Sequence, residues 1–134
     1  MSNDGLGMTV GLGHTDFDAA VARVVDALKV EGFGVITEID VQETIKQKLG
    51  VDVRKYKILG ACNPPIAHAA LQADPMIGLL LPCNIIVFEG ERGDVTVSIA
   101  NPRRMFELVA TPGVEGMVEQ VHAKLSRAAA GLRG

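Results

Sequence analysis

Two runs of alternating residues joined by a short polar loop constrain this chain more than any other feature. The runs are Asn84 to Glu89 and Asp94 to Ile99, and Gly90-Glu91-Arg92-Gly93 separates them. Period-two runs separated by a short loop that contains glycine are typical of a β-hairpin, whose strands are antiparallel. The sequence therefore predicts at least one antiparallel pair, onto which the rest of the sheet must be built.

Three earlier segments also have strand character, and amphipathic or capped helices separate them. We expect strands at 8–14, 34–39 and 53–62, and helices at 16–31, 41–49 and after residues 63, 101 and 111. The order β-α-β-α-β-α-β-β-α-α predicts an α+β fold. In it, a single, largely antiparallel sheet of about five strands has helices packed against it.

Capping residues mark where these helices begin. Thr15 and Asp40 stand at two helix starts, and Asn63 precedes Pro64 at a third. Asn, Asp and Thr accept hydrogen bonds from the free N–H groups of a first helical turn, and proline suits its first position. We expect one domain over residues 8–127, with residues 1–7 and 128–134 as flexible ends.

Charge and hydropathy exclude several classes of function. The 134 residues carry a formal net charge of −3, which argues against a broad nucleic-acid surface. No apolar run reaches the ~20 residues of a membrane span, and the N-terminus lacks the pattern of a secretory signal. We therefore expect a cytoplasmic protein whose two cysteines are reduced, with neither nucleic acid nor membrane as a partner.

The most distinctive chemical feature is a pair of Cys-Asn dipeptides, Cys62-Asn63 and Cys83-Asn84. Cys62 ends a predicted strand directly before a helix, where positive partial charge favours a thiolate. If the two strand ends are neighbours, the thiols could bind a soft metal such as Cu(I) or Zn(II), or form a reversible disulfide. His68, on the helix that follows Cys62, is a conceivable third metal ligand.

Each of these residues also has a structural interpretation. Free cysteine often fills core space, and the spacing between Cys62 and Cys83 matches no known zinc pattern. Asn63 is explained as a helix cap, Asn84 as a turn residue and His68 as a surface helix residue. No catalytic residue is identified, because serine nucleophile, phosphate-loop and acid–base motifs are missing from the sequence. The sequence therefore favours a non-enzyme and leaves any cofactor unknown.

Several of these motifs resemble one known family. Gly60-Ala61-Cys62-Asn63-Pro64, Asp74-Pro75 and the run Gly78-Leu79-Leu80-Leu81-Pro82-Cys83-Asn84 resemble the bacterial and archaeal domain of unknown function 302 family, from about residue 8 to residue 125. Asn101 before Pro102 departs from the Asp expected in many relatives, although both residues cap helices well. The resemblance implies a compact α+β fold that forms a homodimer. It implies no activity, and it gives no role to the motif residues.

Three hypotheses follow from the sequence. The first is a small binding module that holds a soft metal or another thiophilic ligand at Cys62, Asn63, Cys83 and Asn84. The second is a thiol redox enzyme or sensor in which Cys62 attacks and Cys83 resolves. The third is a non-catalytic dimeric interaction domain with structural cysteines.

Overall fold

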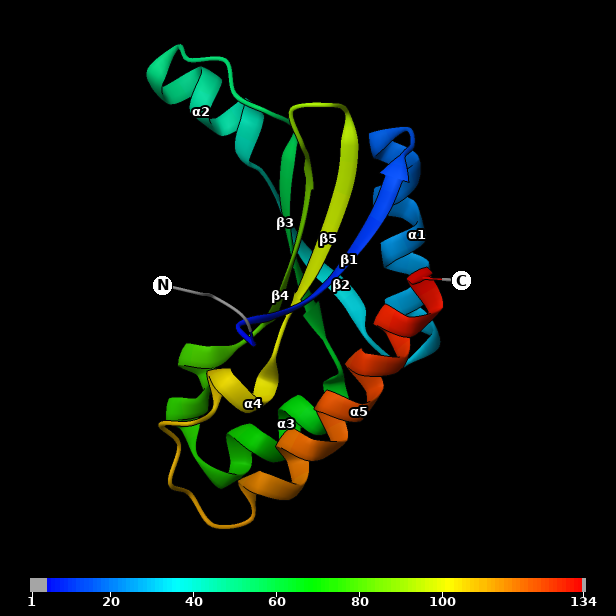
Figure 1. Ribbon diagram of the computed structural model, residues 1–134. Coiled ribbons are helices and arrows are strands. Elements are labelled where there is room, and N and C mark those ends of the chain that lie inside the picture. The colour runs from blue at the N-terminus through cyan, green and yellow to red at the C-terminus, as the bar shows by residue number, and fades with distance from the viewer. Residues whose placement is uncertain (1–4, 134) are drawn as a thin grey trace.

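A computed structural model describes residues 5–133 as one five-stranded sheet with helices beside and below it (Figure 1). The elements are β1 (Gly7–His14), α1 (Phe17–Val30), β2 (Gly34–Asp40), α2 (Val41–Leu49), β3 (Tyr56–Cys62), α3 (Pro64–Ala73), the 3-10 helix η1 (Pro75–Leu80), β4 (Cys83–Glu89), β5 (Asp94–Ala100), α4 (Pro102–Met105) and α5 (Val114–Arg133). The strands lie in the order β1-β5-β4-β3-β2, and each neighbouring pair is antiparallel. The predicted α+β fold with one antiparallel sheet is therefore confirmed.

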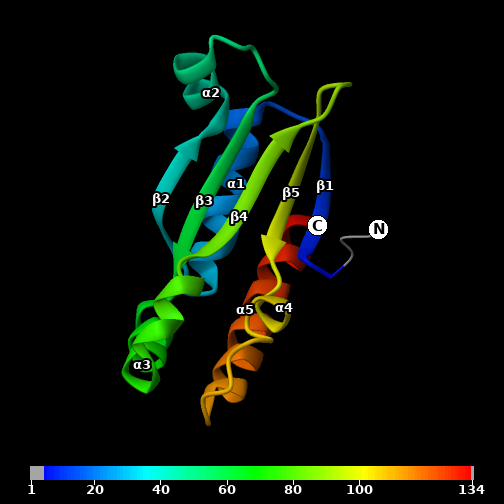
Figure 2. The same cartoon turned by 90° about the vertical axis from the view of Figure 1, so that its left-hand side faces the viewer.

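Helices α1 and α5 cover one face of this sheet, and the core lies between them and the strands. In Figure 2 both helices lie behind the strands, and the opposite face of β3, β4 and β5 is turned to the viewer. Leu59, Ile85 and Val97 point from three neighbouring strands toward the helices and are fully buried. Burying aliphatic side chains of this size contributes roughly 1.5–3 kcal/mol each, so this layer holds the sheet in place.

The predicted helix caps agree with the structure at two of three positions. Asp40 accepts a hydrogen bond from the backbone N–H of Glu43 at 3.0 Å, and Asn63 caps α3. The prediction was wrong at α1, where Asp16 rather than Thr15 accepts from the Ala19 N–H at 3.0 Å. Thr and Asp are both good caps, so their adjacency left the first residue of this helix ambiguous.

Helix α5 corrects the expected flexible C-terminus. The helix runs to Arg133, and Ala128, Ala129 and Leu132 are buried against the main core. These residues continue the helical stripe begun by Leu125, so their burial favours the ordered helix over a frayed end. At the other end, the expected flexible segment 1–7 overlaps β1 at Gly7, and residues 1–4 lie outside the described residues.

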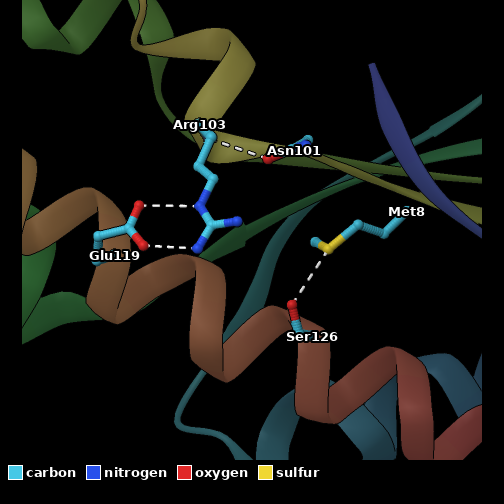
Figure 3. A network of polar contacts seen from close by, with 5 residues as sticks. All are labelled: Met8, Asn101, Arg103, Glu119 and Ser126. Carbon is cyan, nitrogen blue, oxygen red and sulfur yellow. Dashed lines mark hydrogen bonds and ion pairs between the residues drawn. The ribbon is translucent and has the colours of Figure 1, made fainter. Parts of the chain in front are cut away.

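The N-terminal half of α5 organises a second, smaller cluster below the sheet. Ala70, Ile77 and Val114 are its buried residues, contributed by α3, η1 and α5. Arg103 of α4 reaches across to α5, where its guanidinium donates to both carboxylate oxygens of Glu119 at 2.6 and 2.9 Å (Figure 3). Farther along α5, the Ser126 hydroxyl donates to the Met8 sulfur on β1 at 3.4 Å. Helix α5 thus ties the lower cluster to the sheet.

Among the described residues, 5–133, no helix is both long and apolar enough to cross a membrane.

Candidate functional site

The topology makes Cys62 and Cys83 neighbours. Cys62 is the last residue of β3 and Cys83 the first of β4, and these strands pair with Ala61 opposite Cys83. A one-residue offset between regular antiparallel strands separates the Cα atoms by roughly 5.5–6.5 Å. That separation lies within the ~4.4–6.8 Å range of disulfide-bridged cysteines. Regular alternation, however, would point Cys83 to the face of Ala61 and Cys62 to the opposite face, so the strand register alone does not bring the two thiols together.

Both cysteines lie in the wall of one cavity at the lower end of the sheet. Its volume is about 50 Å³. Its wall is formed by residues from the sheet end, α3, α4 and α5: Phe33, Ala61, Cys62, Asn63, Ile66, Ala67, Ala70, Leu81, Pro82, Cys83, Pro102, Phe106, Val114, Met117, Val118 and Val121. None of these residues is charged at neutral pH, and Asn63 is the only one with an amide side chain. The two thiols and the Met117 thioether are therefore the main groups there able to bind a ligand.

Burial changes the chemistry of Cys83. Burial and, to a smaller extent, the charge of the nearby Cys62 together raise the pKa of this thiol to about 11. The cause is that a thiolate in an apolar wall loses its hydration, while a neutral thiol does not. Cys83 is therefore protonated at neutral pH, and any ligand that takes its thiolate must displace a proton.

The two asparagines occupy different environments. The Asn63 side chain accepts from the Ile66 N–H at 3.4 Å and lies in the cavity wall, so it both caps α3 and borders the site. Asn84 is exposed and lies instead in a second pocket, of about 190 Å³. That pocket shares Cys83 and Phe106 with the first. The two Cys-Asn dipeptides are thus not equivalent halves of one site.

His68 is exposed on α3 and does not join the cysteines in a three-ligand set. Across residues 5–133, no group of three or more His, Cys, Asp or Glu side chains is arranged to hold a metal ion. The wall instead contains Met117, which was not among the residues that the sequence indicated as ligands. The residue type alone could have identified Met117 as a candidate ligand, because thioether sulfur binds soft metals.

The comparisons with known proteins agree with this fold. The family model described as Domain of unknown function DUF302 matches residues 8–132. The chain belongs to the DUF302 family. A crystal structure of an uncharacterised conserved DUF302 protein from Bacillus stearothermophilus is similar to it, with a TM-score of 0.85 and 26% identity. That likeness covers 96% of this chain and 98% of the other. No match was found among curated proteins.

Family membership confirms the resemblance predicted from the Cys-Asn and Asn-Pro motifs. Neither the family description nor the description of that crystal structure names an activity.

Proposed function

We propose that this DUF302 protein is a small binding module that holds a soft, thiophilic ligand between Cys62 and Cys83, with Cu(I) as the favoured ion. The observation that carries the proposal is that both thiols line one small, uncharged cavity. Binding is favoured over catalysis because that wall offers no carboxylate, imidazole or amine for proton transfer.

The size of the cavity limits the ligand. A volume of about 50 Å³ admits a few water-sized groups, whereas pockets for drug-sized molecules measure roughly 300–1,000 Å³. A single ion or a molecule of a few atoms fits this space. The side chain of Asn63 borders the same space, but its amide oxygen accepts the helix-capping hydrogen bond from the Ile66 N–H. We therefore do not count Asn63 as a ligand of the ion.

The donor chemistry favours Cu(I) over Zn(II). Thiolates and thioethers select Cu(I), and the wall supplies two cysteines and Met117. Zn(II) in structural sites takes four ligands, which this wall does not provide. Binding of Cu(I) would release one proton from each thiol and leave a complex with one negative charge. The first turn of α3 begins directly after Cys62 and Asn63, and its positive end would offset part of that charge.

Chelator competition under anaerobic, reducing conditions tests this function. Titration of Cu(I) against a chromophoric Cu(I) chelator should give one ion per chain for the wild type. Cys62→Ser and Cys83→Ser should each abolish competition, and Met117→Leu should weaken it. His68→Ala is the matched control and should bind as the wild type does. A wild type that cannot compete, or that competes equally well after either serine substitution, would reject the proposal.

A second candidate is a reversible dithiol–disulfide couple, which is supported by the position of Cys62 and Cys83 in the wall of one cavity. Each thiol would lose one hydrogen to an oxidant such as glutathione disulfide, which would be reduced to two glutathione molecules. The dithiol and the disulfide would both be uncharged in the apolar wall. Thiol counting after equilibration in glutathione buffers tests it. Loss of two titratable thiols together, at a potential within the cellular range, would support this couple. Retention of both under oxidising buffer would exclude it.

Either function requires reduced thiols at some stage. We therefore place the protein in a reducing compartment such as the cytoplasm, where glutathione and thioredoxin keep cysteines reduced.

A further inference from the structure

Cys83 lies in the walls of two neighbouring spaces, and only one of them also contains Cys62. The second pocket, of about 190 Å³, lies beside the cavity of about 50 Å³ whose wall includes both thiols. We call the larger space the outer pocket and the smaller one the inner cavity. Five residues line both spaces and form a shared wall: Leu81, Pro82, Cys83, Pro102 and Phe106. A single layer of side chains therefore separates the two spaces.

The outer pocket is the more accessible of the two. The rest of its wall consists of Leu79, Leu80, Asn84, Ala100 and Met105. Leu79 retains 80% of its surface in solvent and Asn84 is exposed, whereas every residue that lines the inner cavity is buried or half-buried. A small species from solution can therefore reach Cys83 through the outer pocket before it meets Cys62.

The outer pocket contains a sulfur donor of its own, the thioether of Met105. Met105 is the last residue of α4, and it lines the outer pocket but not the inner cavity. Met117 has the opposite placement, since it lines the inner cavity but not the outer pocket. The sulfur residues therefore follow an order from outside to inside, with Met105 first, Cys83 in the shared wall, and Cys62 and Met117 last.

The contacts of α4 fix the place of Met105. The Asn101 side chain accepts from the Arg103 N–H at 3.0 Å, and the Met105 N–H donates to the Asn101 carbonyl at 3.1 Å. Arg103 also forms the ion pair with Glu119 of α5 that Figure 3 shows. Because α4 is tied at its start and to α5, the position of Met105 at the pocket wall is part of the fold.

We propose that the outer pocket is the route by which Cu(I) enters and leaves the protein, and that Met105 holds the ion first and passes it to Cys83. This inference rests on the proposed binding function and adds an entry site to it. Thioether sulfur favours Cu(I), and it has no proton to lose when it binds. The described residues that line the outer pocket include no carboxylate, so Mg²⁺ and Ca²⁺ find no ligand of the kind they prefer there.

The transfer is a ligand exchange without a change of oxidation state. The bond between copper and the Met105 sulfur breaks as a bond to the Cys83 sulfur forms, and the Cys83 thiol proton passes to water. Cys62 then binds and releases its own proton, so the ion finishes between two thiolates in the inner cavity. Loss of the ion follows the same steps in reverse.

A third pocket borders the inner cavity on another side and offers a competing route. It measures about 200 Å³ and shares Phe106, Val114 and Val118 with the inner cavity. The described residues that line it include neither cysteine nor methionine, and the ion pair of Arg103 with Glu119 lies in its wall. Cu(I) would find no sulfur ligand along that route, so the outer pocket is favoured.

Transfer kinetics test the role of Met105. Stopped-flow mixing under anaerobic, reducing conditions follows the colour of a Cu(I)–chelator complex as the protein takes the ion, and excess chelator measures release. Met105→Leu should slow uptake and release by the same factor, roughly tenfold or ~1.4 kcal/mol in the barrier, because the final site and its affinity do not change. Met76→Leu is the matched control and should behave as the wild type, since Met76 is 66% exposed and lines neither space.

The other outcomes are distinct. Wild-type rates after Met105→Leu would overturn the entry site. A weaker equilibrium affinity after Met105→Leu would also overturn it, because Met105 would then be a ligand of the final complex. Slower uptake after Glu115→Gln, which alters the third pocket, with no effect of Met105→Leu, would support the competing route instead. A wild type that never takes Cu(I) from the chelator would reject the proposed function itself, and with it the role of Met105.

A thiol reagent tests the route without copper. Methyl methanethiosulfonate transfers its methylthio group to a thiol and releases methanesulfinate, and mass spectrometry measures the rate at Cys83 in a Cys62→Ser background. Ala100 has the smallest side chain in the outer pocket, so Ala100→Leu should narrow this pocket and slow the reaction severalfold. Val109→Leu, in the third pocket, is the control and should react at the unaltered rate. In concentrated urea all three proteins should react equally. A rate at Cys83 that Ala100→Leu leaves unchanged would overturn the route, whatever ion the thiols bind.

Discussion

Ionisation of Cys83 should make this protein lose stability in alkaline solution. Burial raises the pKa of the thiol from its ordinary 9.0 to about 11 in the folded chain. Below pH 9 the thiol is neutral in both the folded and the unfolded chain. Between pH 9 and 11 the unfolded chain releases the proton while the folded chain retains it, so the free energy of unfolding falls as pH rises.

The size of the loss follows from the shift. One pKa unit corresponds to ~1.36 kcal/mol, so a shift of about two units gives at most about 2.7 kcal/mol by pH 11. Partial exposure of Cys83 reduces this upper value. Above pH 11 both states are ionised and the contribution no longer changes.

Denaturant unfolding at a series of pH values provides the assay. The free energies of unfolding of the wild type and of Cys83→Ala should differ by a constant amount between pH 7 and 8. Between pH 8 and 11 the value for the wild type should fall more steeply than the value for Cys83→Ala. Lysine and tyrosine titrate in both proteins, so their contributions cancel in the difference. Cys62→Ala should retain most of the effect, because burial is the larger cause and the charge of Cys62 the smaller. A difference that stays constant from pH 8 to 11 would refute the reasoning.

Five further substitutions follow from local geometry, and thermal or urea unfolding measures the free energy change of each of them. Asn63→Ala should cost about 1 kcal/mol because the cap of α3 is lost, whereas Asn84→Ala, at an exposed position, should stay within about 0.5 kcal/mol; equal effects would contradict the difference between the two dipeptides. Gly60→Ala should destabilise by roughly 1–3 kcal/mol, since its Cβ would overlap a threonine hydroxyl and a proline ring, while Gly11→Ala has open space and should be nearly neutral. Leu132→Ala should cost about 2–5 kcal/mol if the end of α5 is core, and a negligible change would restore the view that this end is frayed.

The parts of the fold that are set by local rules could be predicted from the sequence. The hairpin of β4 and β5 follows from alternation around a glycine-containing loop, and Asp40 and Asn63 cap helices because nearby N–H groups need acceptors. The antiparallel pairing of β3 with β2 and with β4 does not follow from such local rules, because helices join these strands and a helical connection is also compatible with parallel pairing.

The assembly of the cavity could not be predicted in this way. Phe106 and Met117 meet the cysteines only because α4 and α5 fold back beneath the sheet, which is a long-range contact. The sequence predicted a helix after residue 111 but did not show which residues Met117 on that helix would contact. The end of α5 was misassigned for a related reason, since small alanines give a weak local signal and become core only when α1 packs beside them.

X-ray absorption at the copper edge of the Cu(I)-loaded, reduced protein tests the central claim most directly. The first shell of the copper should contain only sulfur, with at least the two thiolates of Cys62 and Cys83, and Met117→Leu should leave those two in place. A first shell that contains nitrogen or oxygen, or a single sulfur, would contradict a site built from the two cysteines in an apolar wall.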